Sequence, residues 1–194
     1  GMKVGALKFS DHPRATVLKI DTSAAENMDG VIRIFTAQDV PGDRQIGLIK
    51  QDWPLMIAEG ETTRYVGDVL ALVVAETDTA ARNAVAEIKV EYEVLDPLTD
   101  MHKALLPDAP LLHPQGNKLS RSYTSRGDMA AAEARSAFIA QGVFETQMIE
   151  HGFMEPECTV ARPLDDGVEV FSSGQGIFDD RIQIAKVLGL PLQK

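Results

Sequence analysis

The sequence predicts an α+β fold for this chain of 194 residues. Three observations support that prediction. Residues 69–75 form a continuously apolar run, which is typical of a strand buried on both faces. The helical spacing of apolar residues changes to strict alternation at Ile88. Two further strand-like runs flank Asp166-Gly167 and lead directly into a helical pattern, so strands and helices follow one another along the whole chain.

The first predicted elements are a strand at residues 15–21 (ATVLKID) and a short helix after it. Ser23 and Glu26 have the spacing of a capping box, which predicts that Ser23 opens the helix. Gly30 is expected to end it, because glycine commonly follows the last helical turn.

A second strand is predicted at residues 31–36 (VIRIFT), where Ile32 and Ile34 alternate with Arg33. The sequence VPGD at residues 40–43 predicts a turn after it. The apolar run at 69–75 is expected to be the central strand of the sheet.

A helix is predicted to begin at Thr77, whose hydroxyl can cap the free amides of the first turn. One face of this helix carries Ala81, Ala84, Val85 and Ile88 at helical spacing. The following residues alternate apolar and charged side chains, which predicts a strand with one solvated face up to Val94. The change of period marks the boundary between the two elements.

Four prolines lie between Pro97 and Gly127, and they exclude a long regular element there. We therefore expect one domain at residues 1–100, a linker at 101–127 and a second domain at 128–194. The sequence contains neither internal repeats nor low-complexity tracts.

The second region begins with an alanine-rich helix (DMAAAEARSAF), for which Asp128 is the predicted N-cap, and continues with an extended segment at 141–149. A hairpin follows, in which Asp166-Gly167 is expected to adopt positive φ in a tight turn. The last predicted helix places Phe178, Ile182, Ala185 and Leu188 on one face and ends at Gly189 and Pro191.

Gln175 stands between Gly174 and Gly176 where the second hairpin strand gives way to this helix. The amide could belong to an ordinary turn, or a bare backbone could present it to a ligand. Glycine patterns this short are more often turns than ligand sites. The pattern alone leaves both interpretations open.

Composition excludes several classes of protein. The net charge is −10 and no Lys/Arg cluster is present, which argues against nucleic acid or an anionic membrane as partner. No apolar stretch is long enough to span a membrane. The single cysteine, Cys158, cannot form an internal disulfide and favours a reducing, cytoplasmic location. Gly1 before Met2 is typical of tag removal, and we expect the chain to be an excised piece.

His151, with Glu150, Glu155 and Glu157 nearby, could suggest a metal site. The spacing matches no metalloprotease helix, so no metal ligand is predicted and His151 is expected to form a structural, hydrogen-bonded pair. Cys158 is expected to be an inert packing residue, because neighbouring carboxylates disfavour a thiolate.

Asp179 and Asp180 are interpreted as favourable charge at a helix N-terminus in preference to an acid/base pair. Trp53 and His113 are expected to anchor loops to the domain surface and are given no catalytic role.

Six segments, in this order, resemble the start of the molybdopterin-binding large subunit of the xanthine dehydrogenase and aldehyde oxidase family, beginning with its α/β hammerhead domain. They span nearly the whole chain: IDTSAAENMDGVIRIFTAQDVPG, RYVGDVLALVVAET, VEYEVLDPLTD, LHPQGN, IEHGFMEPECTVARP and VEVFSSGQGIFDDRIQIAKVLGLP. The resemblance implies that residues 1–100 are a hammerhead domain and that residues 128–194 begin a truncated molybdopterin-binding domain.

The resemblance also implies the site. The family's glutamine at the position of Gln175 hydrogen-bonds an oxo ligand of the molybdenum, and Gly174 and Gly176 would let the backbone approach the cofactor. The family's glycine-rich cofactor loop is expected after Lys194 and its glutamate base further on, so no catalytic residue is predicted in this chain. Iron–sulfur clusters and FAD are expected on other domains or subunits.

The implied reaction is hydroxylation of an electron-poor carbon with oxygen from water, on a purine, a related N-heterocycle or an aldehyde. Many members of the family have a Pro-His pair after the glutamine, whereas this chain has Ile177 and Phe178 leading into DDRIQIA. That run resembles the selenium-dependent xanthine dehydrogenases, which favours a purine as substrate. The expected partners are the remaining molybdopterin-binding domains, the redox domains and the substrate. The piece alone is expected to be inactive. The alternative is a free-standing hammerhead-like binding or assembly module, which the sequence after Lys194 would distinguish.

Overall fold

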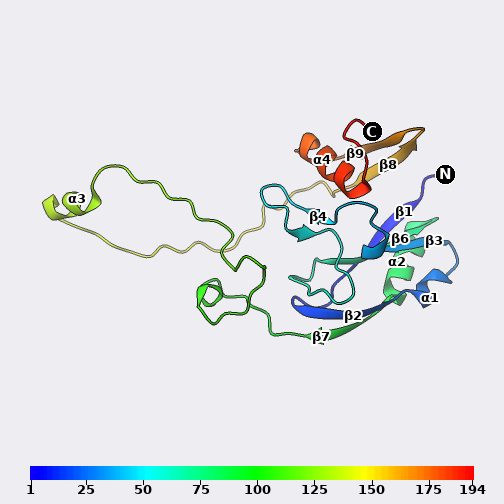
Figure 1. The fold of residues 1–194 in the computed structure, drawn as a ribbon, viewed down its shortest axis with the longest axis horizontal. Coiled ribbons are helices and arrows are strands. Elements are labelled where there is room, and N and C mark those ends of the chain that lie inside the picture. The colour runs from blue at the N-terminus through cyan, green and yellow to red at the C-terminus, as the bar shows by residue number, and fades with distance from the viewer. The chain divides into compact units, whose positions relative to one another are not determined.

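A computed structural model describes residues 1–194, and the chain forms two units (Figure 1). The first unit combines Gly1–Met101 with Cys158–Lys194, and the second is His102–Glu157. This grouping differs from the sequence division at 101–127, which stays a prediction. The mixture of helices with small antiparallel sheets confirms the predicted α+β class. No helix of the chain is long and apolar enough to cross a membrane.

The main sheet is antiparallel and has the strand order β1 (Val4–Phe9), β6 (Val69–Ala75) and β3 (Val31–Thr36). The prediction that the apolar run is central is confirmed, because β6 pairs with a strand on each side. Its side chains are accordingly buried at Leu70, Ala71, Val73 and Ala75.

Strand β1 was not expected from the sequence. It contains Gly5, and its large apolar residues Leu7 and Phe9 are 42% and 46% exposed. The half-buried positions are Val4, Ala6 and Lys8. Because one of the three is a lysine and one is a small alanine, the sequence shows no clear apolar face for a strand here. Pairing with β6, about 65 residues away in the sequence, is what orders this strand.

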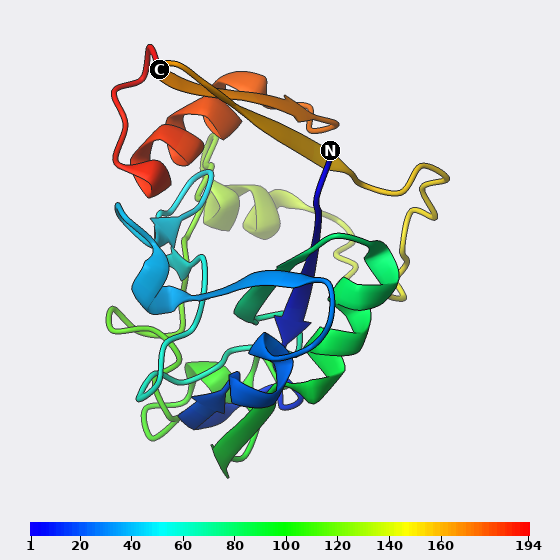
Figure 2. The same ribbon diagram turned by 90° about the vertical axis from the view of Figure 1, so that its right-hand side faces the viewer.

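Two helices cover this sheet, α1 (Ser23–Glu26) and α2 (Asp78–Glu87), and α2 lies beside β1 (Figure 2). The predicted cap is confirmed, because the Thr77 side chain accepts a hydrogen bond from the Ala80 amide at 3.1 Å. One core cluster contains Ala25, Ile34, Ala71, Val73, Ala84 and Ile88.

Strands β2 (Ala15–Asp21) and β7 (Lys89–Val94), each predicted as a strand, form a second antiparallel pair. A second cluster of Val17, Ile57 and Leu70 lies against this pair. Ile20 and Val90 pack against both clusters, so the two sheets share one apolar interior.

Helix α1 begins at Ser23 as predicted, but the expected capping box of Ser23 and Glu26 does not form, because Thr22 is the N-cap and Ser23 is already helical. The Asp21 carboxylate replaces the expected Ser23 cap and accepts hydrogen bonds from Ser23 Oγ (2.6 Å) and Ser23 N (3.1 Å). These bonds lower the pKa of Asp21 to about 2, since they favour the ionised form. Glu26 accepts a bond from Thr22 Oγ1 at 2.6 Å.

The predicted alternation in β3 fails at Ile32, which is 48% exposed whereas Ile34 is 8% exposed. The register with β6 shifts between Val31 and Arg33, so Ile32 has no place on the inner face.

The connection between β3 and β6 contains η1 (Ala37–Asp39), β4 (Gln45–Ile46) and β5 (Trp53–Pro54). The Trp53 ring meets Tyr65 edge-on at 5.3 Å and the Arg64 guanidinium at 5.6 Å. Both partners belong to the same connection, so the anchoring of this loop to the domain surface stays a prediction.

The second unit contains η2 (Lys103–Leu105) and α3 (Met129–Arg135). Asp128 caps α3 as predicted and accepts a bond from the Ala131 amide at 2.9 Å. The helix ends at Arg135, before the predicted Phe138, and the extended segment expected at 141–149 belongs to no strand.

Strands β8 (Thr159–Leu164) and β9 (Gly167–Ser172) form the predicted hairpin, and α4 (Ile177–Leu188) follows. The turn prediction is wrong in detail, because neither Asp166 nor Gly167 has positive φ. Gly167 is needed for another reason: a Cβ there would lie 2.1 Å from the Lys194 carbonyl oxygen.

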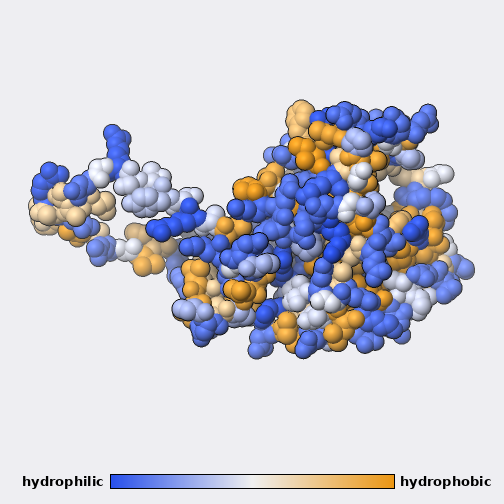
Figure 3. Space-filling model, viewed as in Figure 1, coloured by the Kyte–Doolittle hydropathy of each residue, from blue (hydrophilic) through white to orange (hydrophobic).

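The predicted apolar face of α4 is not its contact face. Phe178 is 70% and Ile182 is 45% exposed, whereas residues 183–187 are half-buried. Apolar atoms therefore lie at the surface over the region of α4 (Figure 3). The helix ends as predicted at Gly189, which has φ 64°.

Candidate functional site

Gln175 lies in the connection between β9, which ends at Ser172, and α4, which begins at Ile177. The predicted strand-to-helix position is thereby confirmed. Its side chain is exposed and forms no hydrogen bond within the chain. A neutral amide with two free N–H donors is thus available to a ligand.

The junction is closed by other residues. Gly174 N donates to Ser172 Oγ (3.1 Å), Ser172 Oγ donates to Asp180 Oδ2 (3.2 Å), and Asp180 N donates to Gly176 O (2.9 Å). Because these three bonds turn the chain without Gln175, the structure gives that side chain no role in the turn itself.

The two glycines differ in their surroundings. A Cβ on Gly174 would lie 2.7 Å from Asp180 Oδ2 and 3.2 Å from Ser172 Oγ, so a larger residue here would displace the Asp180 side chain. A Cβ on Gly176 would meet nothing nearer than Asp179 Oδ2 at 3.5 Å, which is an ordinary contact. The space beside Gly176 is therefore the open side of the junction.

The N-terminus of α4 begins at Gly176 without a side-chain cap, and Asp179 and Asp180 lie in its first turn. The predicted placement of these carboxylates at a helix N-terminus is confirmed. Their negative charge stabilises the helix by interacting with the positive end of its dipole. Their negative charge disfavours a second anion at this end. The junction therefore suits a ligand atom that accepts a hydrogen bond from a neutral amide.

A cavity of about 590 Å³ lies between the hairpin and α4. Its lining is mostly apolar and includes Val168, Val170, Phe171, Ile177, Ile184 and Leu190. Gln175, Gly174 and Gly176 do not line it. The predicted site residues thus lie together at the junction and outside this cavity.

Two other predictions are wrong. Cys158 is exposed, so it is no packing residue. The His151 side chain is 96% exposed, and its Nδ1 lies 3.7 Å from Glu150 Oε1, too far for the expected hydrogen bond. Only the His151 backbone amide donates to Glu150 Oε1, at 2.9 Å. No group of three His, Cys, Asp or Glu side chains could hold a metal ion. His113 is half-buried in its loop.

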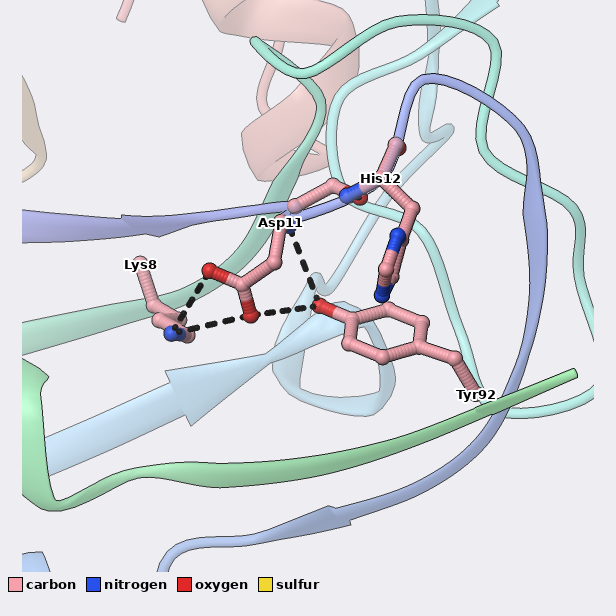
Figure 4. Close-up of polar contacts among 5 residues, drawn as sticks. Lys8, Asp11, His12 and Tyr92 are labelled. Atoms are coloured by element: carbon pink, nitrogen blue, oxygen red, sulfur yellow. Dashed lines mark hydrogen bonds and ion pairs between the residues drawn. The ribbon is translucent and has the colours of Figure 1, made fainter. Parts of the chain in front are cut away.

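One polar cluster was not predicted (Figure 4). The Tyr92 hydroxyl donates to Asp11 Oδ2 and accepts from Asp11 N, both at 3.3 Å, and Lys8 Nζ lies 3.4 Å from the same carboxylate. The His12 ring meets Tyr92 edge-on at 4.9 Å. Burial raises the pKa of Tyr92. These contacts join the β1–β2 turn to β7, and no spacing in the sequence signals a pairing 81 residues apart.

Two family models match the chain and together cover most of it. Residues 1–96 match the family described as aldehyde oxidase and xanthine dehydrogenase, a/b hammerhead domain. Residues 112–194 match the molybdopterin cofactor-binding domain. The chain belongs to this family of molybdopterin-binding large subunits. The resemblance stated from the six sequence segments is therefore confirmed, and Gln175 falls within the matched molybdopterin-binding region.

Individual relatives agree with this family assignment. The chain is 36% identical to a probable xanthine dehydrogenase subunit of Bacillus subtilis (strain 168), with 100% of the chain and 26% of the relative covered. It is 31% identical to the nicotinate dehydrogenase large molybdopterin subunit of Eubacterium barkeri, covering 94% of the chain and 43% of the relative. The chain thus spans about a quarter to under a half of these relatives.

A solved structure also agrees. The aldehyde oxidoreductase from Desulfovibrio gigas is 27% identical and superimposes with a TM-score of 0.86, covering 97% of this chain and 22% of that one. The hammerhead and the hairpin–helix region therefore follow a known arrangement of elements.

Proposed function

We propose that this chain supplies the hammerhead domain and the beginning of the molybdopterin-binding domain of a molybdenum hydroxylase. The enzyme would hydroxylate an electron-poor carbon with oxygen from water. The observation that carries the proposal is the free amide of Gln175 at a junction that closes without it, inside the region matched to the molybdopterin cofactor-binding domain.

The residues at the junction fit this cofactor. Gln175 offers neutral N–H donors, which suit an oxo ligand of the metal, and Gly176 leaves space beside it. When bound, the molybdenum–pterin group supplies a Lewis-acidic, two-electron redox centre. Gln175 would orient and polarise that centre by one preorganised hydrogen bond. The cofactor contacts are therefore assigned to Gln175 and Gly176, with Gly174 shaping the backbone between Ser172 and Asp180.

The proposed substrate is a purine, a related N-heterocycle or an aldehyde. The names of the relatives span these classes: xanthine, nicotinate and aldehyde. A purine is favoured, because the 36% identical Bacillus subtilis relative covers the entire chain. All three substrate classes present a carbon that is polarised by an adjacent nitrogen or oxygen, as attack by a water-derived oxygen requires.

Electrons from this reaction would leave through iron–sulfur clusters to FAD on partner domains or subunits, in the cytoplasm. The catalytic base and most of the pterin contacts would come from the remaining molybdopterin-binding domains. The division into a domain at 1–100, a linker at 101–127 and a domain from 128 belongs to the same proposal.

The test is an isotope experiment on the assembled enzyme that carries this chain. Purified enzyme is assayed with xanthine, nicotinate and an aldehyde in water enriched in ¹⁸O, while molybdenum is measured by elemental analysis. We expect stoichiometric molybdenum, a preference for the purine, and ¹⁸O in the product. Product oxygen derived from O₂, or turnover that is independent of molybdenum content, would contradict the proposal.

The 194-residue chain alone provides the matched control. We expect it to bind no molybdenum and to hydroxylate nothing, because a pterin cofactor needs several converging donors and this chain offers one edge of them. Stoichiometric molybdenum in the purified chain would contradict this part of the proposal.

A further inference from the structure

Residues 41–51, in the connection between β3 and β6, contact the last two turns of α4. Gly42 N donates to the Val187 carbonyl at 2.9 Å, and Asp43 N donates to the Lys186 carbonyl at 3.1 Å. The last carbonyls of a helix have no partner within the helix. A loop about 140 residues earlier in the sequence therefore completes the C-terminal cap of α4.

Side chains reinforce this contact. Lys186 Nζ lies 3.0 Å from Asp43 Oδ2, donates to Gln51 Oε1 at 2.8 Å, and donates to the Gln45 carbonyl at 3.3 Å. Its positive charge is also favourable near the C-terminus of a helix. The pKa of Asp43 is lowered, first by a hydrogen bond from Gln45 N and then by Lys186, so the Asp43 carboxylate stays ionised at neutral pH. One lysine thus ties three points of the loop to α4.

The fit of the two backbones depends on glycine. A Cβ on Gly42 would lie 2.1 Å from the Lys186 carbonyl oxygen and 2.7 Å from Gly189 N, which no side chain permits. Gly47 N adds a further bond to Gln183 Oε1 at 2.9 Å, one turn before Lys186. The loop therefore follows α4 over about one and a half turns.

The packing of α4 does not fix it by itself. No residue of α4 is fully buried, and its apolar side chains Phe178 and Ile182 are 70% and 45% exposed. The hydrogen bonds and the ion pair from residues 41–51 are consequently a large share of what holds this helix in place.

We infer that residues 41–51 are a clamp that positions α4 and, through it, Gln175. A helix of 12 residues is a stiff rod about 18 Å long, and Gln175 lies two residues before its first turn. Fixing the C-terminal end therefore fixes the direction from which Gln175 reaches its ligand. Gly42 and Lys186 are therefore positioning residues for the molybdenum site. Their effect on catalysis rests on the proposed function, whereas the clamp itself does not.

The clamp can be tested on the 194-residue chain without any cofactor. Cys158 is the only cysteine, so Cys158→Ser with Gln175→Cys accepts one nitroxide label beside α4. We expect Lys186→Met to raise the label's mobility and to speed amide exchange at Gly42 and Asp43. Gly42→Ala should do so more strongly. In Lys186→Arg the label should be as immobile as in the parent chain, because arginine keeps the positive charge.

The matched control is Lys89→Met, at an exposed lysine of β7, which should leave both signals unchanged. Thermal melting by circular dichroism verifies that each variant is folded. Label mobility and amide exchange unaltered by both Lys186→Met and Gly42→Ala would overturn the inference.

The catalytic consequence is measured in the assembled enzyme. We expect Lys186→Met to lower turnover per bound molybdenum by about three- to tenfold and Lys186→Arg to recover most of it, because a small displacement of a polar group weakens transition-state contacts. A mobile label with unchanged turnover in Lys186→Met would overturn the positioning role. The turnover of Gln175→Ala is measured separately. Unchanged turnover in that variant would contradict the proposed cofactor contact, whereas the mobility of the label tests the clamp independently.

Discussion

Residues 1–96 and residues 102–194 differ in how they are stabilised. Every fully buried side chain of the chain lies in the first region, at positions up to Ile88, and none lies in the second. The second region forms its helices and hairpin from local bonds, such as the Asp128 cap and the β8–β9 pairing. Its large apolar side chains stay exposed, among them Phe138 at 94% and Phe144 at 93%.

This difference has a functional meaning. The hammerhead holds a core of its own and acts as a scaffold, and its loop at 41–51 reaches α4. The hairpin and α4 carry Gln175 but depend on contacts outside their own local structure. A site built on such elements is precise only when neighbouring parts hold it.

The largest expected effect would test the contrast in burial. Leu70 in β6 is 0% exposed, so Leu70→Ala should lower the free energy of unfolding by about 2 to 5 kcal/mol. Leu111, which is 67% exposed, is the matched control, and Leu111→Ala should cost less than about 0.5 kcal/mol. Urea titration followed by circular dichroism measures both. Equal losses of unfolding free energy in the two variants would contradict the difference in burial between the two regions.

A smaller effect is expected at the junction that holds Gln175. Gly174→Ala should cost about 1 kcal/mol, because its Cβ would displace the Asp180 carboxylate from Ser172. Gly176→Ala meets only an ordinary contact and should cost less. Thermal melting and amide exchange over α4 give the comparison. A larger loss of stability in Gly176→Ala than in Gly174→Ala would contradict this prediction.

The smallest effect concerns a polar contact within the first region. Two bonds from Arg44, at 2.7 and 3.0 Å, lower the pKa of Glu61. A lowered pKa stabilises the fold above the unfolded value of about 4.3 and loses that stabilisation as pH falls through the folded value. The pair is partly exposed, so the contribution is at most about 1 kcal/mol.

The measurement is urea titration between pH 7 and pH 3. Arg44→Met should lower stability at pH 7 and flatten its decline on the acid side. Arg82→Met, in an exposed ion pair with Asp78, is the control and should leave the pH profile unchanged. A profile for Arg44→Met that is parallel to that of the parent chain would contradict this assignment.

Much of the first region follows from its sequence. Local signals were sufficient for the Thr77 cap, for the central position of β6 and for the alternation in β7. They failed where pairing between distant residues decides the outcome. Strand β1 is ordered by β6, and the shift of register beside Arg33 turns Ile32 outward. Neither contact leaves a periodic pattern in the sequence.

In the second region the hairpin and α4 were predictable, but the end of α3, the segment at 141–149 and the packed face of α4 were not. The hairpin strands, the end of α4 at Gly189 and the position of Gln175 followed from the sequence, whereas the dihedral angles of the hairpin turn did not. The apolar spacing of α4 indicated Phe178 and Ile182 as the packed side, yet both are exposed. A Cβ on Gly174 would meet the Asp180 carboxylate, a contact that only the folded junction reveals.

The most direct test of the central claim, that Gln175 contacts the cofactor, is Gln175→Ala in the assembled enzyme, with turnover normalised to bound molybdenum. Loss of one preorganised donor to a charged group should cost about 1.5 to 3 kcal/mol, which lowers turnover by about ten- to a hundredfold. The melting temperature should stay unchanged, because the side chain is exposed and bonds to nothing in the chain. Gln115→Ala, at an exposed loop glutamine, should alter neither quantity. Full turnover per molybdenum in Gln175→Ala would show that this residue does not contact the cofactor.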